Sequence, residues 1–202
     1  MKKIIYICST NQNKINEINS FFENHKLDFQ IFKSPVDISG IVENGDSFYE
    51  NAKIKALFLA EKINYSEYVL ADDSGLCVMS LNNFPGINSA RFSVDGRFDY
   101  EIKNDYLLNA VRNKDNAAKF ICSLVLVDKN GRIHNFESHC NGRLRRNISP
   151  SKNGFGFDPI FFSDEVNKFF SDLSIEEKNK YSHRGKALKL LVDYFKDKNS
   201  IY

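Results

Sequence analysis

The sequence predicts an α/β fold in which helices flank a mixed β-sheet. Strand-like apolar runs and helical patterns alternate through residues 1–71, as they do in folds that place helices around parallel strands. In the middle of the chain, strand-like runs at 120–127 and 132–139 are joined through Asn130-Gly131, a pair typical of a tight β-hairpin. Because a hairpin pairs its strands antiparallel, we expect both kinds of pairing in one sheet.

The length and charge of the chain limit the classes of protein it can belong to. Its 202 residues suit one sizeable domain or two tightly joined lobes, with a core that requires no disulfides. The 28 Lys and Arg against 26 Asp and Glu leave a net charge of +2, which predicts no nucleic-acid partner. No segment approaches the roughly 20 apolar residues of a membrane span, so no membrane role is expected.

The cysteines and the N-terminus predict a cytoplasmic protein. Cys8, Cys77, Cys122 and Cys140 lie far apart without a C-x-x-C pair, which favours buried free thiols over disulfides or metal ligands. The apolar run at residues 4–8 is too short for a signal peptide and is expected to be the first strand.

The first elements follow in order from this strand. A polar turn at 9–13 leads into a helix whose apolar residues recur at helical spacing: Ile15, Ile18, Phe21 and Phe22. Residues 27–32 are expected to form the second strand. Ser47 and Glu50 have the spacing of a capping box and predict a helix that reaches Ala60.

The remaining elements are expected around and after an acidic segment. A strand at 68–71 ends in an acidic turn, and Phe84-Pro85-Gly86 then breaks the chain. A helix at 100–112 has a predicted apolar side of Ile102, Tyr106, Leu107 and Val111. A second capping box at Ser174 and Glu177 opens a short helix. The last helix has a predicted core face of Leu188, Leu190, Leu191, Val192 and Phe195.

The acidic segment is the first candidate site. Asp72 and Asp73 follow a buried strand, and carboxylates there can hold a divalent metal or accept a proton. A charged turn capped by Ser74 and Gly75 is the alternative. Because neighbouring side chains of a strand point to opposite faces, Asp73 is expected to serve the metal and the water, while Asp72 supports the turn from behind.

A phosphate site is predicted before the first helix. Hydroxyls, amides and a lysine gather where helix N–H groups and the helix dipole favour an anion: Ser9, Thr10, Asn11, Gln12, Asn13 and Lys14. Ordinary capping by Thr10 or Asn11 is the alternative. Glu43 can join Asp73 around a magnesium ion or be a solvated surface acid, whereas Glu50 already has a capping role.

Two further segments carry chemistry. Glycines at 154 and 156 allow close approach to a flat ligand, Phe155 or Phe157 can stack on it, and Asp158 can accept hydrogen bonds from a purine edge. A tight turn with core aromatics is the alternative. Residues 182–186 and Lys178 place hydrogen-bond donors at a helix N-terminus, where an anion or a carbonyl would favour them; a solvated basic helix start is the alternative.

Six motifs follow one another along almost the whole chain. They are Ser9-Thr10-Asn11-x-x-Lys14, Glu50-Asn51-Ala52-x-x-Lys55-Ala56, Ala71-Asp72-Asp73-Ser74-Gly75-Leu76, Pro85-Gly86-Ile87-x-Ser89-Ala90-Arg91, Gly154-Phe155-Gly156-Phe157-Asp158-Pro159 and Ser182-His183-Arg184-Gly185-x-Ala187-Leu188. Together they resemble the inosine/xanthosine triphosphate pyrophosphatase family, whose members hydrolyse noncanonical purine nucleoside triphosphates.

The resemblance implies an elongated mixed sheet, two lobes around a central cleft, and a homodimer. It implies the following site residues: Ser9 to Lys14 and Lys55 for the triphosphate, Glu43 and Asp73 for Mg²⁺, Asp73 as base, Ser74 and Arg91 for substrate, Phe155, Gly156, Phe157 and Asp158 around the base, and Lys178, His183 and Arg184 for the nucleotide. Three positions depart from the family pattern: Phe157 replaces Tyr or Trp, Asn88 replaces Tyr, and Thr10 replaces Gly.

The implied reaction is hydrolysis of ITP, dITP or XTP to the nucleoside monophosphate and pyrophosphate. Donors from His183 or Arg184 can meet the 6-oxo group of such a purine, whereas the amino group of adenine leaves them unpaired. The alternatives are a pyrophosphatase of broader nucleotide specificity and a nucleotide-binding sensor without turnover.

Overall fold

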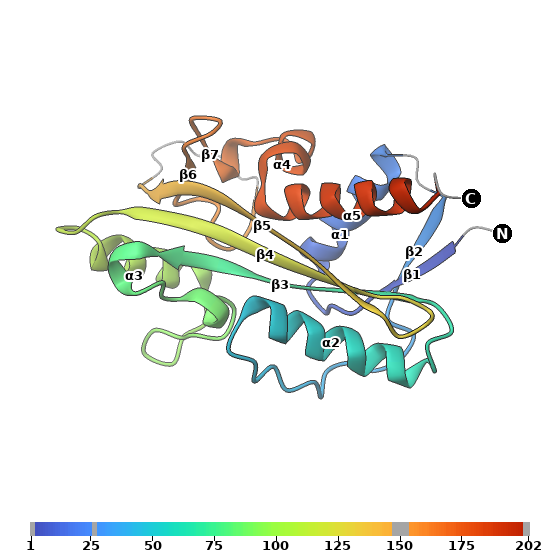
Figure 1. Ribbon diagram of the computed structural model, residues 1–202. Coiled ribbons are helices and arrows are strands. Elements are labelled where there is room, and N and C mark those ends of the chain that lie inside the picture. The colour runs from blue at the N-terminus through green and yellow to red at the C-terminus, as the bar shows by residue number, and fades with distance from the viewer. Residues whose placement is uncertain (1–2, 26–27, 147–153, 200–202) are drawn as a thin grey trace. The chain divides into compact units, whose positions relative to one another are not determined.

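The computed structural model describes residues 3–25, 28–146 and 154–199, which form seven strands and five α-helices (Figure 1). The strands are β1 (Lys3–Ile7), β2 (Phe29–Lys33), β3 (Tyr68–Val78), β4 (Ala117–Val127), β5 (Ile133–Leu144), β6 (Phe161–Ser163) and β7 (Lys168–Phe169). The helices are α1 (Gln12–Asn24), α2 (Phe48–Lys62), α3 (Tyr100–Ala110), α4 (Ile175–Tyr181) and α5 (His183–Asn199).

The sheet is mixed, which confirms the predicted fold class. Its strand order is β2-β1-β3-β4-β5-β6-β7. Strand β1 pairs in parallel with β2 and β3, and β6 pairs antiparallel with β5 and β7. The predicted second strand begins at Phe29, and Leu27 lies outside the described residues.

The chain divides into two compact units. Unit 1 comprises residues 1–73, 122–138 and 184–202, and unit 2 comprises residues 74–121 and 139–183. The unit boundaries fall within β3, β4 and β5 and after the first residue of α5.

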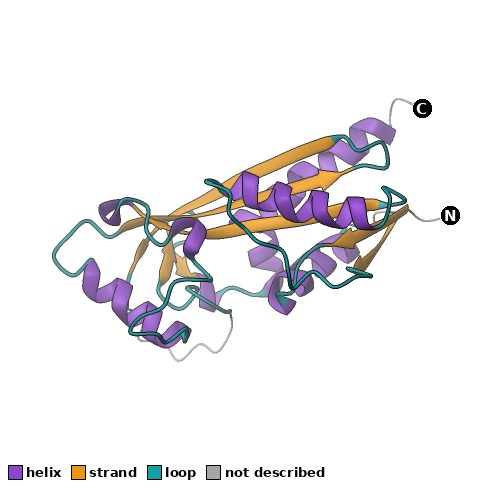
Figure 2. Cartoon of the chain, turned by 90° about the horizontal axis from the view of Figure 1, so that it is seen from below, coloured by secondary structure: helices purple, strands orange, loops and turns teal. Residues whose placement is uncertain are grey.

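Unit 1 has helices on both faces of its strands. Helices α1 and α5 lie on one face and α2 on the other (Figure 1), and α2 lies in front of the strands in the view of Figure 2. Leu70 of β3 belongs to the core beneath α1 and α5, whereas its neighbours Val69 and Ala71 pack against α2. This alternation is that of a strand buried on both faces, and it determines where the following carboxylates point.

Unit 2 has a core rich in aromatic rings. Phe120 of β4 packs against Phe161 and Phe170 at centroid distances of 4.7 and 5.6 Å. Leu76 of β3 and Leu107 of α3 belong to the same cluster. Such contacts stabilise a unit that contains only two of the five α-helices.

The predicted acidic turn is wrong, because β3 continues through Asp72, Asp73, Ser74 and Gly75 to Val78. Both carboxylates form ion pairs, described below, and a strand can carry buried acids where their charges are compensated.

The predicted buried faces of α3 and α5 are each wrong at one residue. Leu190 of α5 and Tyr106 of α3 are exposed to 45%. The buried face of α3 includes Lys103 and Asn104, and Nζ of Lys103 and Nδ2 of Asn104 donate to backbone carbonyls inside unit 2.

Of the two predicted capping boxes, that of α4 is complete and that of α2 is not. Ser174 and Glu177 exchange both hydrogen bonds. Ser47 accepts the N–H of Glu50, but the Glu50 carboxylate accepts the N–H of Asp46 instead of that of Ser47.

The predicted free thiols are confirmed, since all four cysteines are buried and without disulfides. Burial raises the pKa of Cys8 and of Cys122 to about 12, so these thiols stay protonated. None of the helices in the described ranges is long and apolar enough to cross a membrane.

Candidate functional site

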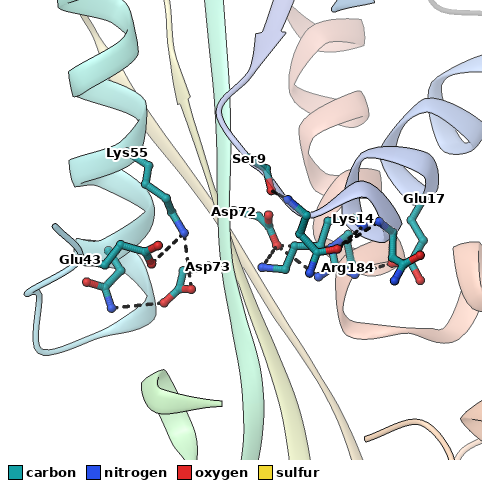
Figure 3. Close-up of polar contacts among 11 residues, drawn as sticks. Ser9, Lys14, Glu17, Glu43, Lys55, Asp72, Asp73 and Arg184 are labelled. Carbon is teal, nitrogen blue, oxygen red and sulfur yellow. Dashed lines mark hydrogen bonds and ion pairs between the residues drawn. The ribbon is translucent and has the colours of Figure 1, made fainter. Parts of the chain in front are cut away.

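Asp72 and Asp73 lie on opposite sides of β3, as the alternation of the strand predicts (Figure 3). Asp73 points toward Lys55 and Glu43, on the side of α2. Asp72 points toward Lys14 and Arg184, on the side of α1 and α5. The two adjacent acids therefore belong to two different clusters of unit 1.

The first cluster joins Asp73 to Glu43 through a lysine. Nζ of Lys55 lies 3.0 Å from Oε2 of Glu43 and 3.5 Å from Oδ1 of Asp73. Glu43 precedes α2 and Lys55 lies within it, so the structure brings these three predicted residues together. Two carboxylates near one point fit a cation with few protein ligands.

Asn51 orients Asp73, and sequence reasoning missed it. Its side chain is fully buried, its Oδ1 accepts the N–H of Gly45 at 2.9 Å, and its Nδ2 donates to Oδ2 of Asp73 at 3.3 Å. A Cβ at Gly45 would lie 2.6 Å from Cβ of Glu50, so only glycine allows this close approach. The signal for Asn51 was its place in the Glu50-Asn51-Ala52 motif.

The second cluster surrounds Asp72 with cations. Oδ2 of Asp72 lies 2.9 Å from Nζ of Lys14 and 3.2 Å from Nη2 of Arg184. Arg184, 3% exposed, also forms an ion pair with Glu17 of α1. Asp72 thus holds Lys14 at the start of α1, and Glu17 holds the arginine. Sequence reasoning missed Glu17, which carries no motif signal.

The surroundings move the pKa values of the two acids in opposite directions. Burial tends to raise the pKa of Asp72, but the attraction of Lys14 and Arg184 outweighs it and holds this pKa well below its usual range. Burial also raises the pKa of Asp73, and there the attraction of Lys55 does not cancel the effect. Asp72 is therefore a permanent anion, while Asp73 is the better proton acceptor.

Lys55 remains charged between its carboxylates. Burial lowers its pKa, but the nearby acids, chiefly Asp73, outweigh burial and raise the pKa above the ordinary value. A buried lysine that keeps its charge can stabilise a phosphate oxygen.

The predicted phosphate segment begins α1, and the capping alternative also holds there. Asn11 is the N-cap, and its Oδ1 accepts the N–H groups of Asn13 and Lys14 at 3.0 and 3.3 Å. The side chains of residues 10–13 are exposed and Ser9 is partly exposed. The Ser9 hydroxyl accepts the N–H of Asn11 at 3.2 Å, and Oε1 of Gln12 accepts a hydrogen bond from Nζ of Lys33 at 2.6 Å. Because residues 10–13 are exposed even though Asn11 caps the helix, this segment can still contact an anion.

In unit 2, the predicted base-binding residues gather around Asp158. Oδ2 of Asp158 lies 2.6 Å from Nζ of Lys178 and accepts the N–H of Phe155 at 2.7 Å. Nζ of Lys178 also lies 5.0 Å from the ring centroid of Phe155. Phe157 is only 3% exposed, whereas Phe155 is partly exposed, so Phe155 is the better stacking surface.

The other predicted residues of unit 2 are placed as follows. The His183 ring is buried and stacks on Phe120 at 4.6 Å and 8°. Ser74 is partly exposed. Nη2 of Arg91, which is exposed, donates to the Ile87 carbonyl at 2.8 Å. Ser89 was named above only as part of the motif that begins at Pro85. Its hydroxyl accepts the N–H of Leu76 at 2.9 Å and so connects its loop to β3.

The donor set fits magnesium better than a metal held by protein alone. In the described part of the chain, no three His, Cys, Asp or Glu side chains form a metal-binding group. Mg²⁺ usually takes one or two carboxylates and completes its shell with waters and substrate phosphates. Glu43 and Asp73 are a pair of this kind.

Known proteins resemble this chain over nearly its whole length. A sequence model of the Ham1 family matches residues 5–194. The dITP/XTP pyrophosphatase of Borrelia duttonii is 40% identical over 190 residues, which cover 92% of this chain and 93% of that protein. The protein of the same name from Staphylococcus epidermidis is 35% identical and covers 98% of each chain.

A solved structure agrees with these sequences. The Ham1 protein of Staphylococcus aureus has a TM-score of 0.83 and 33% identity, and the match covers 97% of this chain and all of that one. The resemblance drawn from the six motifs is thus confirmed. The chain belongs to the Ham1 family.

Proposed function

We propose that this protein hydrolyses noncanonical purine nucleoside triphosphates, namely ITP, dITP and XTP, to the nucleoside monophosphate and pyrophosphate. The observation that carries the proposal is the pair of clusters on β3, in which one acid holds Lys14 and the other lies with Glu43 at Lys55. Membership of the Ham1 family and the names of the relatives support it.

The lysines and the start of α1 are proposed to bind the triphosphate. Lys14 and Lys55 with one Mg²⁺ bring about four positive charges toward a substrate that carries about four negative ones. Asp72 and Arg184 act on this site through Lys14, which Asp72 contacts. Residues 9–13 supply amides and hydroxyls.

Glu43 and Asp73 are proposed to hold Mg²⁺. When bound, the ion would neutralise phosphate charge and make a bound water more acidic. Asp73 is also proposed to accept the proton of the attacking water. Asn51 keeps Oδ2 of Asp73 in place by its hydrogen bond.

Residues of unit 2 are proposed to recognise the base. Phe155 stacks on the purine, while Gly156, Phe157 and Asp158 shape the loop that holds it. His183 donates to the 6-oxo group, and Lys178, Ser74 and Arg91 contact the rest of the nucleotide. Direct contact between Arg184 and substrate stays a prediction, since its guanidinium lies on Asp72 and Glu17.

The assembly and location of the protein also stay predictions from the family resemblance. We propose a homodimer in the cytoplasm. Light scattering during size-exclusion chromatography checks the first, since a dimer of a 23.3 kDa chain has about twice that mass.

An assay with Mg²⁺ and a panel of ITP, XTP, dITP, GTP and ATP tests the proposed function. Pyrophosphate release with ITP, dITP or XTP preferred over ATP supports it. Release of orthophosphate with a diphosphate product contradicts it, and tight binding without product indicates a sensor.

A further inference from the structure

The inward face of α3 carries two consecutive polar side chains. Lys103 is 1% exposed and Asn104 is 8% exposed, one turn before the fully buried Leu107. Burying an ammonium group or an amide costs free energy unless hydrogen bonds or nearby charge compensate for it. The partners of these two residues therefore indicate what the residues do.

Lys103 is held by a loop carbonyl and three rings. Its Nζ donates to the carbonyl of Ala90 at 3.0 Å and lies 4.7, 4.9 and 5.8 Å from the ring centroids of Tyr100, Phe92 and Phe98. Across the described ranges, its ammonium group forms no ion pair with a carboxylate. Attraction between a cation and aromatic faces takes the place of a carboxylate, and two of the rings belong to the same loop as Ala90.

Asn104 holds a second loop in the same way. Its Nδ2 donates to the carbonyl of Gly156 at 3.1 Å. Gly156 has φ of +66°, a conformation that favours glycine, and a Cβ there would lie 3.5 Å from the Tyr100 ring. Tyr100 packs edge-on against Phe157 at 5.1 Å, so α3 meets this loop at two points.

The two loops also meet each other. The rings of Phe92 and Phe157 are nearly parallel, at 9° and 6.2 Å between centroids. One loop carries Arg91, and the other carries Phe155 and Asp158. Both bonds from α3 end on backbone carbonyls, so they fix the path of each loop whatever its side chains are.

We propose that Lys103 and Asn104 are positioning residues that hold, from α3, the loop assigned to the purine base and the Arg91 loop that packs on it through Phe92, and so set the affinity for the base. This inference rests on the proposed function and deepens it. Neither side chain contacts substrate in this account, because Lys103 acts through Ala90 and Asn104 acts through Gly156.

The first test is hydrogen–deuterium exchange without nucleotide. Lys103→Met is expected to speed exchange at residues 88–98 about tenfold, and Asn104→Leu at residues 154–160, because each loses one buried hydrogen bond. Asn109→Leu, in the last turn of α3, and Lys114→Met, four residues after its end, change exposed residues and are the matched controls. Exchange equal to that of the controls overturns the proposal.

The second test distinguishes an effect on binding of the base from an effect on binding of the phosphates. Both variants are expected to raise KM for ITP about tenfold with little change in kcat. The inhibition constant of tripolyphosphate, which has no base, should stay within about twofold of the wild-type value. An unchanged KM, or an equal rise in both constants, overturns the proposal, since a general loss of structure affects both.

A conservative variant tests the proposal again, and the wild-type protein distinguishes its failure from failure of the proposed function. Lys103→Arg keeps the charge, the ring contacts and a donor, and is expected to restore wild-type exchange and KM; a defect equal to that of Lys103→Met overturns the proposal. If Lys103→Met does not fold, Asn104→Leu and its control decide. A wild-type protein that leaves ITP intact refutes the proposed function alone, and the exchange test still decides whether α3 anchors the loops.

Discussion

Single residues in this protein act in pairs that lie far apart in the sequence. Asp72 and Asp73 are neighbours, yet one contacts Lys14 and Arg184 while the other contacts Lys55 and Asn51. Strand geometry separates them, and their different partners give them opposite pKa shifts. We therefore propose that the more strongly paired acid supports the site and that the other accepts a proton.

Asp73→Asn is expected to lower kcat for ITP by about 10²- to 10⁴-fold, because the amide can neither accept the proton nor bring charge to the metal. The midpoint of urea unfolding should change little. Asp28→Asn, at an exposed position, is the control. Turnover within a factor of about two of the wild-type value would remove Asp73 from the mechanism.

Asn51→Ala is expected to lower kcat about fivefold and leave KM nearly unchanged, because Asp73 loses the donor that orients it, worth about 1 kcal/mol. Steady-state kinetics with ITP measure both constants, and Asn24→Ala at the exposed end of α1 is the control. A rise in KM with kcat intact would show that Asn51 serves binding instead.

Elements were easier to predict than the faces they bury. The capping box of α4 and the apolar spacing of α1 depend on residues a few positions apart, so the sequence reveals them. The course of β3 through Asp72 depends on Arg184, which lies 112 residues away. The buried polar face of α3 depends on loop carbonyls, and no periodicity signals these.

The turn between β4 and β5 is stabilised by Asp128. Its Oδ1 accepts the N–H groups of Asn130 and Arg132, both at 2.9 Å. Burial tends to raise the pKa of Asp128, but these hydrogen bonds outweigh it and lower the pKa from 3.8. A lowered pKa means that the carboxylate stabilises the folded state above about pH 4 and that this stabilisation is lost as the pH falls.

Asp128→Ala is expected to lower the free energy of unfolding by about 1 to 2 kcal/mol at pH 7. The difference from the wild-type protein should shrink below pH 4, as the wild-type carboxyl takes up its proton. Urea unfolding followed by circular dichroism between pH 3 and pH 7 measures this. A difference that grows toward low pH would have the wrong sign for this account.

At the scale of the whole molecule, the motifs are shared between the two units. Unit 1 contains the proposed phosphate and metal residues, and unit 2 contains the loops proposed for the base. The six motifs indicated the residues of these clusters; two of the motifs lie within α2 and β3, and the other four lie at the start of α1 or α5 or in loops. Among the residues that hold them, Asn51 lies in the Glu50-Asn51-Ala52 motif, whereas Glu17 and Asn104 had no signal beyond residue type.

Removal of divalent metal should abolish turnover. Two carboxylates and the substrate phosphates are a donor set for Mg²⁺, so EDTA is expected to stop ITP hydrolysis and added Mg²⁺ to restore it. Glu43→Gln should raise the Mg²⁺ concentration needed for half-maximal rate about tenfold or more. Full activity in EDTA would contradict a metal at Glu43 and Asp73.

The position of bond cleavage is the most direct test of the proposed reaction. When ITP is hydrolysed in ¹⁸O-labelled water with Mg²⁺, attack at the α-phosphate puts the label into IMP and leaves the pyrophosphate unlabelled. Mass spectrometry of the two products is expected to show that distribution. Label in orthophosphate, together with IDP, would contradict the account.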